Sequence, residues 1–598
     1  MQAAWLDYLV IAAYFAVVIG VGVHFSRDRK TAENYLLGGR NMPYFTIGVA
    51  CIMSILSSIS IVMVPGEIVN HGLTLTFFGL VGTILGIPCY LLFMRFYFKL
   101  GSFTPYEYLE RRYDGTVRAV VAVSAFYARV MYLGMVLFTT SKILEASYRW
   151  PALFSILFIG AVSIVYTVMG GSKAVIWTDF FQFFVLVGGL VAVIAALCLN
   201  IDGGAAAAVA IPFADGHGLP QFGDPDFYGI SPYVRLLFWL LLLYNVMSSM
   251  QSAASDQLTV QRLLSARNWK EGLKAQIVAT VFGFFFSLIL WFVGLALYTY
   301  FKQNPDPMVG ERQGDAAFFR FVALHLPPPL SGLFMAGMFA AIMSTLSAGY
   351  NAMAAVWLKE FHQKFINRRL DDEGQVRVSR WATFGVGAFS MILAMGLALS
   401  AGWLGQTVAE VGVLFGVLGA VVLPAFLFAA LSPRANARLI WCYTFYAFGE
   451  TIAMNLWYAL SRSARRAWEE DPTRAWGWAD KLEARYALLP LAAGAVLAAA
   501  HFLPAWRRRW PGKLSGLLGM LLLGAAEGML LWYGFSHYYI DAEPLERSFN
   551  FGPPVSLALA FIILFFCPRQ PRGKCQGLTL GTLGQPLADM TDGGAWEK

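Results

Sequence analysis

Long apolar segments, separated by short polar connections, run through most of this chain of 598 residues. Most of them are about 20 residues long, the length at which an α-helix crosses the hydrocarbon core of a bilayer. The pattern predicts an all-α integral membrane protein with about fifteen transmembrane helices. The predicted spans are residues 5–25, 46–64, 73–98, 117–146, 152–170, 174–199, 234–252, 272–300, 330–358, 379–401, 406–431, 438–460, 486–503, 514–536 and 554–567.

The composition and the position of the charges agree with a membrane protein. Hydrophobic residues make up 58% of the chain and charged residues 13%, whereas soluble domains carry about 25% charged residues. The net charge of +8 arises from basic clusters in connections on one side, at 27–40, 111–112, 262–270, 359–380 and 507–509. Because basic loops stay cytoplasmic, we expect a multi-pass protein of a bacterial-type inner membrane, with the N-terminus outside and the C-terminus inside. The positive charge therefore reports topology and does not indicate a nucleic-acid partner.

Two predicted spans, within 46–69 and 236–257, become polar and rich in Ser, Gln or Ala in their second halves. Such interrupted helices at matching positions of two halves indicate the central site of a transporter, because broken helices need a protein-lined cavity. Each opens a block of five spans, 46–199 and 234–431, and two consecutive blocks with an odd number of spans must be inverted relative to each other. The alternative is that these Ser-rich helices simply pack closely against their neighbours.

This organisation divides the chain into five predicted regions. They are a leading helix with its cytoplasmic loop (1–45), a first five-helix repeat (46–199), an inverted second repeat (234–431), additional C-terminal helices (438–567), and a polar tail expected to be disordered (568–598).

An acid, Asp179, lies inside one apolar segment. A charge at the centre of a membrane helix costs about 2.5–3.5 kcal/mol on insertion scales, so such an acid indicates a functional site. On another predicted helix, Ala341, Ser344 and Thr345 stand at positions i, i+3 and i+4 and share one face. An unwound segment near 53–56 would add free backbone carbonyls to these two hydroxyls and one carbonyl.

Together these groups supply about five oxygens, which suit a hard cation such as sodium. Asp179 would then balance the charge of the ion. The alternative is that both hydroxyls bond back to carbonyls of their own helix.

Four segments carry a family resemblance: "GGSKAVIWTDFFQ" (170–182), "SDQLTVQRLLSARN" (255–268), "KTAENYLLGGRNMP" (30–43) and "FAAIMSTLSAGYN" (339–351). They resemble the sodium/solute symporter family, whose signature reads roughly G-G-x-x-A-V-x-W-T-D-x-x-Q. The resemblance covers about residues 5 to 460. It implies the 5+5 inverted-repeat fold of amino-acid and sugar symporters, with ten core helices after one leading helix.

The resemblance also implies a sodium site and assigns its ligands. Its main sodium ligands would be the backbone carbonyls of Met53, Leu56 and Ala341 and the hydroxyls of Ser344 and Thr345, with Asp179 beside them. Some members hold a second sodium through a further hydroxyl, which is absent here because the position is occupied by Ala341. A second ion in this chain would use Asp179, Ser344, Thr345 and Ser347.

The solute cavity is expected at the membrane midplane, between the two interrupted helices. The candidate solute-binding side chains are polar and lie on these helices: Ser57, Ser60, Ser249, Gln251 and Ser252.

Arg129 lies in the middle of a predicted span, and a guanidinium binds carboxylates in a bidentate fork. Its position resembles the carboxylate-binding Arg of the family's bacterial sialic acid transporters, and "MSILSSISIVMVP" (53–65) resembles their sequence. A Gln that helps to hold sialic acid in those transporters would fall near Gly79 here. The alternative for Arg129 is a structural role, paired with an internal acid or with backbone carbonyls.

The sequence thus predicts a sodium-coupled importer of a small polar organic solute, such as a sialic acid, a sugar or another carboxylate. A transporter of a neutral sugar, with Arg129 structural, is the alternative. An enzyme is not expected, because the seven His residues are scattered. A transporter-like sensor and proton coupling are further alternatives. Sodium, the solute and the lipid bilayer are the expected partners, without an obligatory protein partner.

Overall fold

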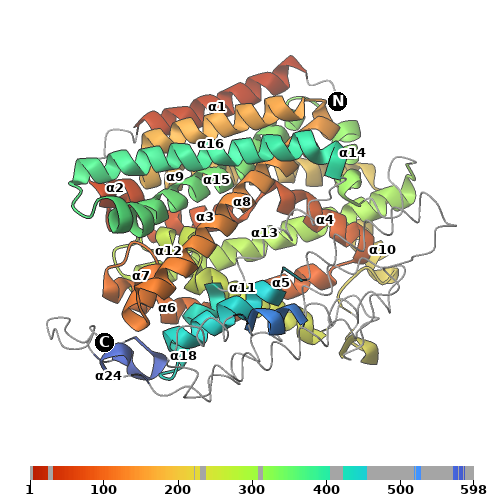
Figure 1. The fold of residues 1–598 in the computed structure, drawn as a ribbon. Helices are drawn as coiled ribbons and strands as arrows, with labels where there is room; N and C mark the ends of the chain where they lie inside the picture. The colour runs from red at the N-terminus through yellow and green to blue at the C-terminus, as the bar shows by residue number, and fades with distance from the viewer. Residues whose placement is uncertain are drawn as a thin grey trace. The chain divides into compact units, whose positions relative to one another are not determined.

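The computed structural model describes residues 4–24, 31–220, 222–228, 238–306, 314–404, 422–450, 452–453, 518, 520–526, 570, 572–576, 578–583 and 585. These residues form helices, turns and loops without a β-strand (Figure 1), which confirms the all-helical prediction. The chain divides into two compact units. Unit 1 consists of residues 1–105, 129–223 and 245–408, and unit 2 of residues 106–128, 224–244 and 409–598.

Unit 1 holds most of the long helices, while α8 and α11 contribute residues to both units. Its elements are α1 (Trp5–His24), α2 (Ala32–Leu37), η2 (Gly38–Arg40), α3 (Tyr44–Ile55), α4 (Ser58–His71), α5 (Thr74–Leu85), α6 (Ile87–Leu100), α8 (Gly115–Tyr148), α9 (Ala152–Asn200), α10 (Gly204–Ala214), α11 (Phe238–Ala254), α12 (Gln257–Leu263), α13 (Trp269–Gln303), α14 (Gly314–His325), α15 (Leu330–Val356), η4 (Trp357–Ile366) and α16 (Asp372–Leu404).

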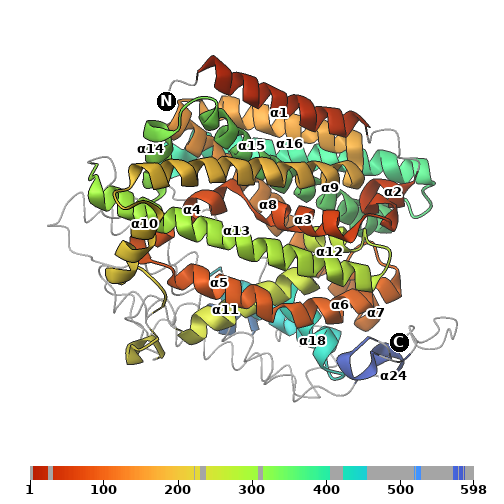
Figure 2. The ribbon, with the colours of Figure 1, turned by 180° about the vertical axis from the view of Figure 1, so that it is seen from behind.

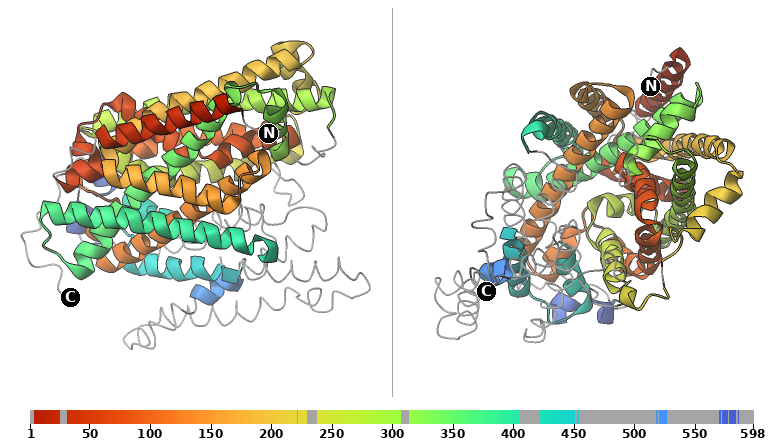
Figure 3. Two further views of the ribbon diagram at one scale, coloured as in Figure 1. Left: turned by 90° about the horizontal axis from the view of Figure 1, so that it is seen from above. Right: turned by 90° about the vertical axis from the view of Figure 1, so that its right-hand side faces the viewer.

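Helix α15 forms the centre of unit 1. It packs against α1, α3, α9 and α16, and Figures 1 and 2 show α1, α9, α15 and α16 running alongside one another. Figure 3 shows α1, in red, from two further sides. Glycines allow the close approach: a Cβ on Gly337 would lie 3.1 Å from the Cα of Leu186, and one on Gly189 would lie 3.0 Å from the Cα of Phe334.

In the described part of the chain, six helices are long and apolar enough to cross a membrane, and up to eight spans result if each of two bent pairs counts as one. In the apolar window of α15 and η4, 89% of the residues are buried, against 28% in those of α13 and α16. α15 is therefore an interior helix, whereas α13 and α16 expose apolar side chains as lipid-facing helices do. The predicted spans 486–503 and 554–567 lie outside the described residues, and 406–431, 438–460 and 514–536 are described only in part.

The two predicted spans at 152–170 and 174–199 form one element, α9, which is broken at Gly171. Gly171 has φ 63° and ψ −165°, a conformation that only glycine adopts readily. A Cβ there would also lie 2.7 Å from the carbonyl oxygen of Tyr35. The second glycine of the G-G motif therefore turns the chain immediately before the helical segment that carries Asp179.

Both predicted interrupted helices are broken. The first consists of α3 and α4, which meet at an angle of 61° around Leu56 and Ser57. The second consists of α11 and α12, which are separated by Ser255 and Asp256. Ser57 caps α4 by accepting a hydrogen bond from the Ser60 amide, and Asp256 caps α12 by accepting one from the Thr259 amide.

Unit 2 contains α7 (Tyr106–Arg112), η3 (Pro225–Tyr228), α18 (Val422–Leu431), α24 (Arg572–Cys575) and η6 (Leu580–Thr582). The last two elements belong to the tail at 568–598, for which disorder is predicted and of which residues 570, 572–576, 578–583 and 585 are described. The buried hydroxyl of Tyr108 donates a hydrogen bond to the Leu578 carbonyl at 2.7 Å, and Lys574 Nζ donates one to the Tyr113 carbonyl at 2.8 Å.

Candidate functional site

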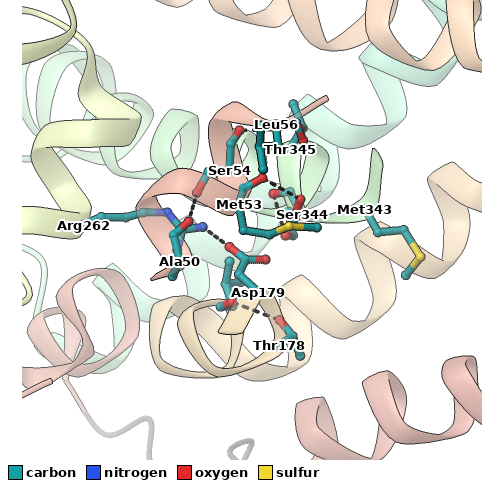
Figure 4. Close-up of polar contacts among 12 residues, drawn as sticks. Ala50, Met53, Ser54, Leu56, Thr178, Asp179, Arg262, Met343, Ser344 and Thr345 are labelled. Carbon is teal, nitrogen blue, oxygen red and sulfur yellow. Dashed lines mark hydrogen bonds and ion pairs between the residues drawn. The ribbon is translucent and has the colours of Figure 1, made fainter. Parts of the chain in front are cut away.

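The break between α3 and α4 leaves backbone carbonyls without the amide partners that a continuous helix would provide. Helix α15 presents two buried hydroxyls to them (Figure 4). Ser344 Oγ lies 3.1 Å from the carbonyl oxygen of Met53 and 2.9 Å from that of Ala341. Thr345 Oγ1 lies 3.4 Å from the carbonyl oxygen of Leu56 and 3.1 Å from that of Ala341.

The structure therefore brings together all five oxygens that the sequence singled out for sodium. The hydroxyls also contact the Ala341 carbonyl of their own helix, so the back-bonding considered as an alternative occurs together with the contacts across to α3. The carbonyl of Ser54, 3.4 Å from Thr345 Oγ1, is a sixth oxygen that sequence reasoning did not identify. Each hydroxyl can turn its lone pairs toward a cation, because its proton has more than one carbonyl to reach.

Asp179 is fully buried, and Arg262 of α12 donates to its Oδ2 atom. In Figure 4 Arg262 reaches Asp179 from the neighbouring ribbon, and the carboxylate points toward the segment that carries Met53. Among the described residues Asp179 Oδ1 has no hydrogen-bond partner, and neither has Arg262 Nη1. Asp179 thus retains an accepting oxygen beside the oxygen cluster. Sequence reasoning missed Arg262 as its partner, although both residues belong to the quoted family motifs.

Ser347, the further candidate ligand of a second ion, is one turn along α15 from Ser344. Its hydroxyl is buried and donates to the Ser344 carbonyl at 3.2 Å. A cation at this place would bind a lone pair of Ser347 Oγ while the hydroxyl proton stays on the Ser344 carbonyl.

Arg129 of α8 forms an ion pair with Asp256, the residue that caps α12. The guanidinium also lies over the ring of Tyr132, 5.6 Å from its centroid. Both charged groups retain some exposure, with 24% of the Arg129 side chain and 17% of the Asp256 side chain accessible. Neither partner of the pair is fully buried, and Asp256 is a polar residue of this region that the sequence analysis did not select.

The candidate solute-binding residues lie on both broken helices. Ser57 Oγ and Ser60 Oγ are 3.3 Å apart at the start of α4. On α11, Gln251 is exposed and Ser252 Oγ donates to the Ser248 carbonyl at 3.2 Å. Ser249 faces the bend between α5 and α6, where a Cβ on Gly86 would lie 2.5 Å from the Ser249 Cβ.

A helical membrane protein with two interrupted helices and carbonyls released from helical hydrogen bonding at one break has the arrangement of a secondary transporter. The model of the Sodium:solute symporter family matches residues 35–439, more than half of the chain. The protein therefore belongs to the sodium:solute symporter family, as its motifs predicted.

Several curated relatives cover most of this range. The sodium/sialic acid symporter NanT of Aliivibrio fischeri is 26% identical over 72% of this chain and 84% of the relative. The sodium/sialic acid symporter SiaT of Proteus mirabilis is 27% identical over 72% of this chain and 86% of the relative. The human sodium/iodide cotransporter is 27% identical over 76% of this chain and 70% of the relative.

Among solved structures, the substrate-bound outward-open state of a sodium-coupled sialic acid symporter is similar in fold. Its TM-score is 0.66 at 22% identity, over 90% of this chain and 99% of the other. This likeness extends the family assignment from sequence motifs to the helical fold.

Proposed function

We propose that this protein is a sodium-coupled symporter that imports a small polar organic solute across the plasma membrane by alternating access. The observation that carries the proposal is the convergence of five oxygens, from Met53, Leu56, Ala341, Ser344 and Thr345, at the break of α3 and α4. Neutral carbonyl and hydroxyl oxygens suit a monovalent hard cation. Sodium is the co-transported ion that the family membership supplies.

The same five oxygens form the proposed main sodium site, with Asp179 balancing the charge of the ion. A second sodium would bind between Asp179, Ser344, Thr345 and Ser347. Because α3 and α15 both contribute oxygens, movement of one helix relative to the other would take the site apart. Sodium would therefore favour the state in which the two helices stay together, and its differential affinity for the two states would drive the cycle.

The proposed topology is a 5+5 inverted repeat with about fifteen spans in the whole chain. The breaks of α3–α4 and α11–α12, each near the start of a predicted five-span block, support it. The proposed regions remain 1–45, 46–199, 234–431, 438–567 and 568–598. The bias of basic residues supports a multi-pass plasma-membrane protein with its N-terminus outside and its C-terminus in the cytoplasm.

The proposed solute is an acid, such as a sialic acid or another carboxylate. The names of the relatives include sialic acid, iodide and monocarboxylate, which all exist as anions at neutral pH. Arg129 would bind the solute carboxylate, and Ser57, Ser60, Ser249, Gln251 and Ser252 would offer hydrogen bonds to its other polar groups.

A neutral sugar is the second candidate, and one contact favours it. Arg129 is already neutralised by Asp256, so a neutral solute would bind without having to replace that carboxylate. In this case Arg129 would be structural.

Thermal stability of the purified protein tests both candidates, because a bound ligand raises the stability of the folded state by mass action. The panel contains N-acetylneuraminic acid, neutral sugars, short carboxylates and amino acids, each in sodium chloride and in choline chloride. We expect an acid to stabilise only in sodium, and Arg129→Ala to abolish this effect. Stabilisation by a neutral sugar in both proteins would favour the second candidate, and no effect of sodium at all would contradict the proposed function.

A further inference from the structure

Helix α12, the second half of the second broken helix, makes polar contacts with several neighbouring segments. Its seven residues, Gln257–Leu263, are all buried. Gln257 Nε2 donates to the Phe103 carbonyl at 3.2 Å, and Gln261 Nε2 donates to Asn351 Oδ1 at 2.9 Å. These contacts connect α12 to the loop after α6 and to α15. Both join neutral groups, so a charged ligand would not compete for them.

The two ends of α12 carry opposite charges, and each end is held by an ion pair. At its start, Asp256 contacts Arg129 of α8. At its end, Arg262 contacts Asp179 of α9. The partners of α12 are thus the two charged residues that the proposed function assigns to the solute and to sodium. In the first pair α12 supplies the acid, Asp256, whereas in the second pair α12 supplies the base and α9 supplies the acid, Asp179.

We propose that α12 couples sodium to the solute by exchange of these two ion pairs. The solute carboxylate takes the place of Asp256 on Arg129, and sodium takes the place of the Arg262 guanidinium at Asp179. This inference rests on the proposed function, which supplies the two ligands. It adds Asp256 and Arg262 as positioning residues that act through the binding residues.

The energetic reason lies in the burial of the released groups. The Arg262 side chain is 5% exposed, and a buried charge that loses its partner is strongly destabilised. Occupation of Asp179 by sodium therefore favours a position of α12 in which the guanidinium reaches water. At the other end of α12, release of Asp256 from Arg129 likewise favours a position of α12 in which the freed charge reaches water. While only one ligand is bound, the other ion pair still holds α12, so sodium alone does not cross.

Asp256→Asn isolates the first exchange. Asn caps helices about as well as Asp, so the start of α12 is retained while the competing charge is removed. We expect this variant to bind N-acetylneuraminic acid about 5- to 150-fold more tightly than the natural protein, the usual range of a coupling between sites. Its affinity for the methyl ester, which lacks the charge, should not change. Proteoliposomes with the variant should also take up radioactive sodium without solute.

Arg262→Gln tests the other end and needs no solute. We expect the sodium concentration that gives half of the thermal stabilisation to fall by a similar factor, whereas Arg262→Lys, which keeps the charge, should retain the natural value. Arg267→Gln is the matched control, because it makes the same substitution at an exposed arginine, whose Nε donates to Asn41 Oδ1.

The outcomes separate this inference from the proposed function. If Arg129→Ala binds N-acetylneuraminic acid as the natural protein does, the solute assignment fails. If Arg129→Ala abolishes binding while Asp256→Asn and Arg262→Gln change neither affinity nor sodium leak, the exchange is overturned and the solute assignment stands. If Asp256→Asn does not fold, the sodium titration of Arg262→Gln decides alone.

Discussion

The hydroxyl of Ser344 lies 3.1 Å from the carbonyl oxygen of Met53, although the two residues are 291 positions apart in the chain. The contact joins the buried helix α15 to the break of α3. A helix break supplies carbonyls, and a hydroxyl-bearing helix beside it supplies oxygens that can rotate. Neither segment alone surrounds a cation, so the proposed ion site requires that the two helices stay together.

Removal of a hydroxyl from this cluster should weaken sodium binding. Ser344→Ala and Thr345→Ala each remove one oxygen, and loss of a contact to a charged group costs about 1.5–3 kcal/mol, or about 10- to 150-fold in affinity. The measurement is solute uptake in proteoliposomes as a function of sodium concentration, corrected for the amount of protein. Ser390→Ala is the control, because this buried serine of α16 donates to the Val386 carbonyl of its own helix. If both variants keep the natural sodium dependence, the two hydroxyls do not bind the co-transported ion.

Gly171 should not tolerate a side chain. Its backbone conformation is accessible essentially to glycine alone, and an added Cβ would lie 2.7 Å from a backbone oxygen of Tyr35. We expect Gly171→Ala to destabilise the fold by about 1–3 kcal/mol and to lower the melting temperature. Gly188→Ala in the same helix is the comparison, since its Cβ would meet only Leu333 Cδ2 at 3.7 Å. Equal stability of the two variants would show that the break in α9 is not required.

An added methyl group should disturb the packing of α11 on α5 at Gly82 but not at Gly79. A Cβ on Gly82 would lie 2.7 Å from the carbonyl carbon of Asn245, whereas a Cβ on Gly79 would meet only the Asn245 side chain at 3.7 Å. Overpacking of this kind costs about 1–3 kcal/mol. Gly82→Ala should displace α11 and lower solute affinity while sodium still stabilises the protein. If Gly79→Ala has the same effect, the contact with the Asn245 backbone does not explain the loss.

A buried hydroxyl in α7 makes one of the contacts that hold the tail. Tyr108→Phe removes the donor of the Leu578 carbonyl, and a buried group left without its partner costs about 1–3 kcal/mol. We expect trypsin to cleave faster at Lys574, and mass spectrometry measures the rate of this cleavage. Tyr8→Phe on α1, an exposed position, should leave the cleavage rate unchanged. A rate equal to that of the natural protein would mean that other contacts hold the tail.

Much of the architecture follows from local patterns in the chain. Apolar length predicts helices, and serine-rich continuations mark the breaks near Ser57 and Asp256. The i, i+3, i+4 spacing of Ala341, Ser344 and Thr345 predicts a common oxygen face. These features are readable because helix period, helix length and backbone propensity act over a few residues.

Tertiary structure decided which distant groups meet. Asp179 and Arg262 are 83 positions apart, and Arg129 and Asp256 are 127 positions apart. The sequence shows that each buried charge needs a partner, because an isolated charge is costly in an apolar interior. Which opposite charge becomes that partner depends on how α8, α9 and α12 pack, and packing sums many contacts between segments far apart in the chain. The same reason applies to the tail, because its composition does not show that the Leu578 carbonyl bonds to Tyr108 of α7.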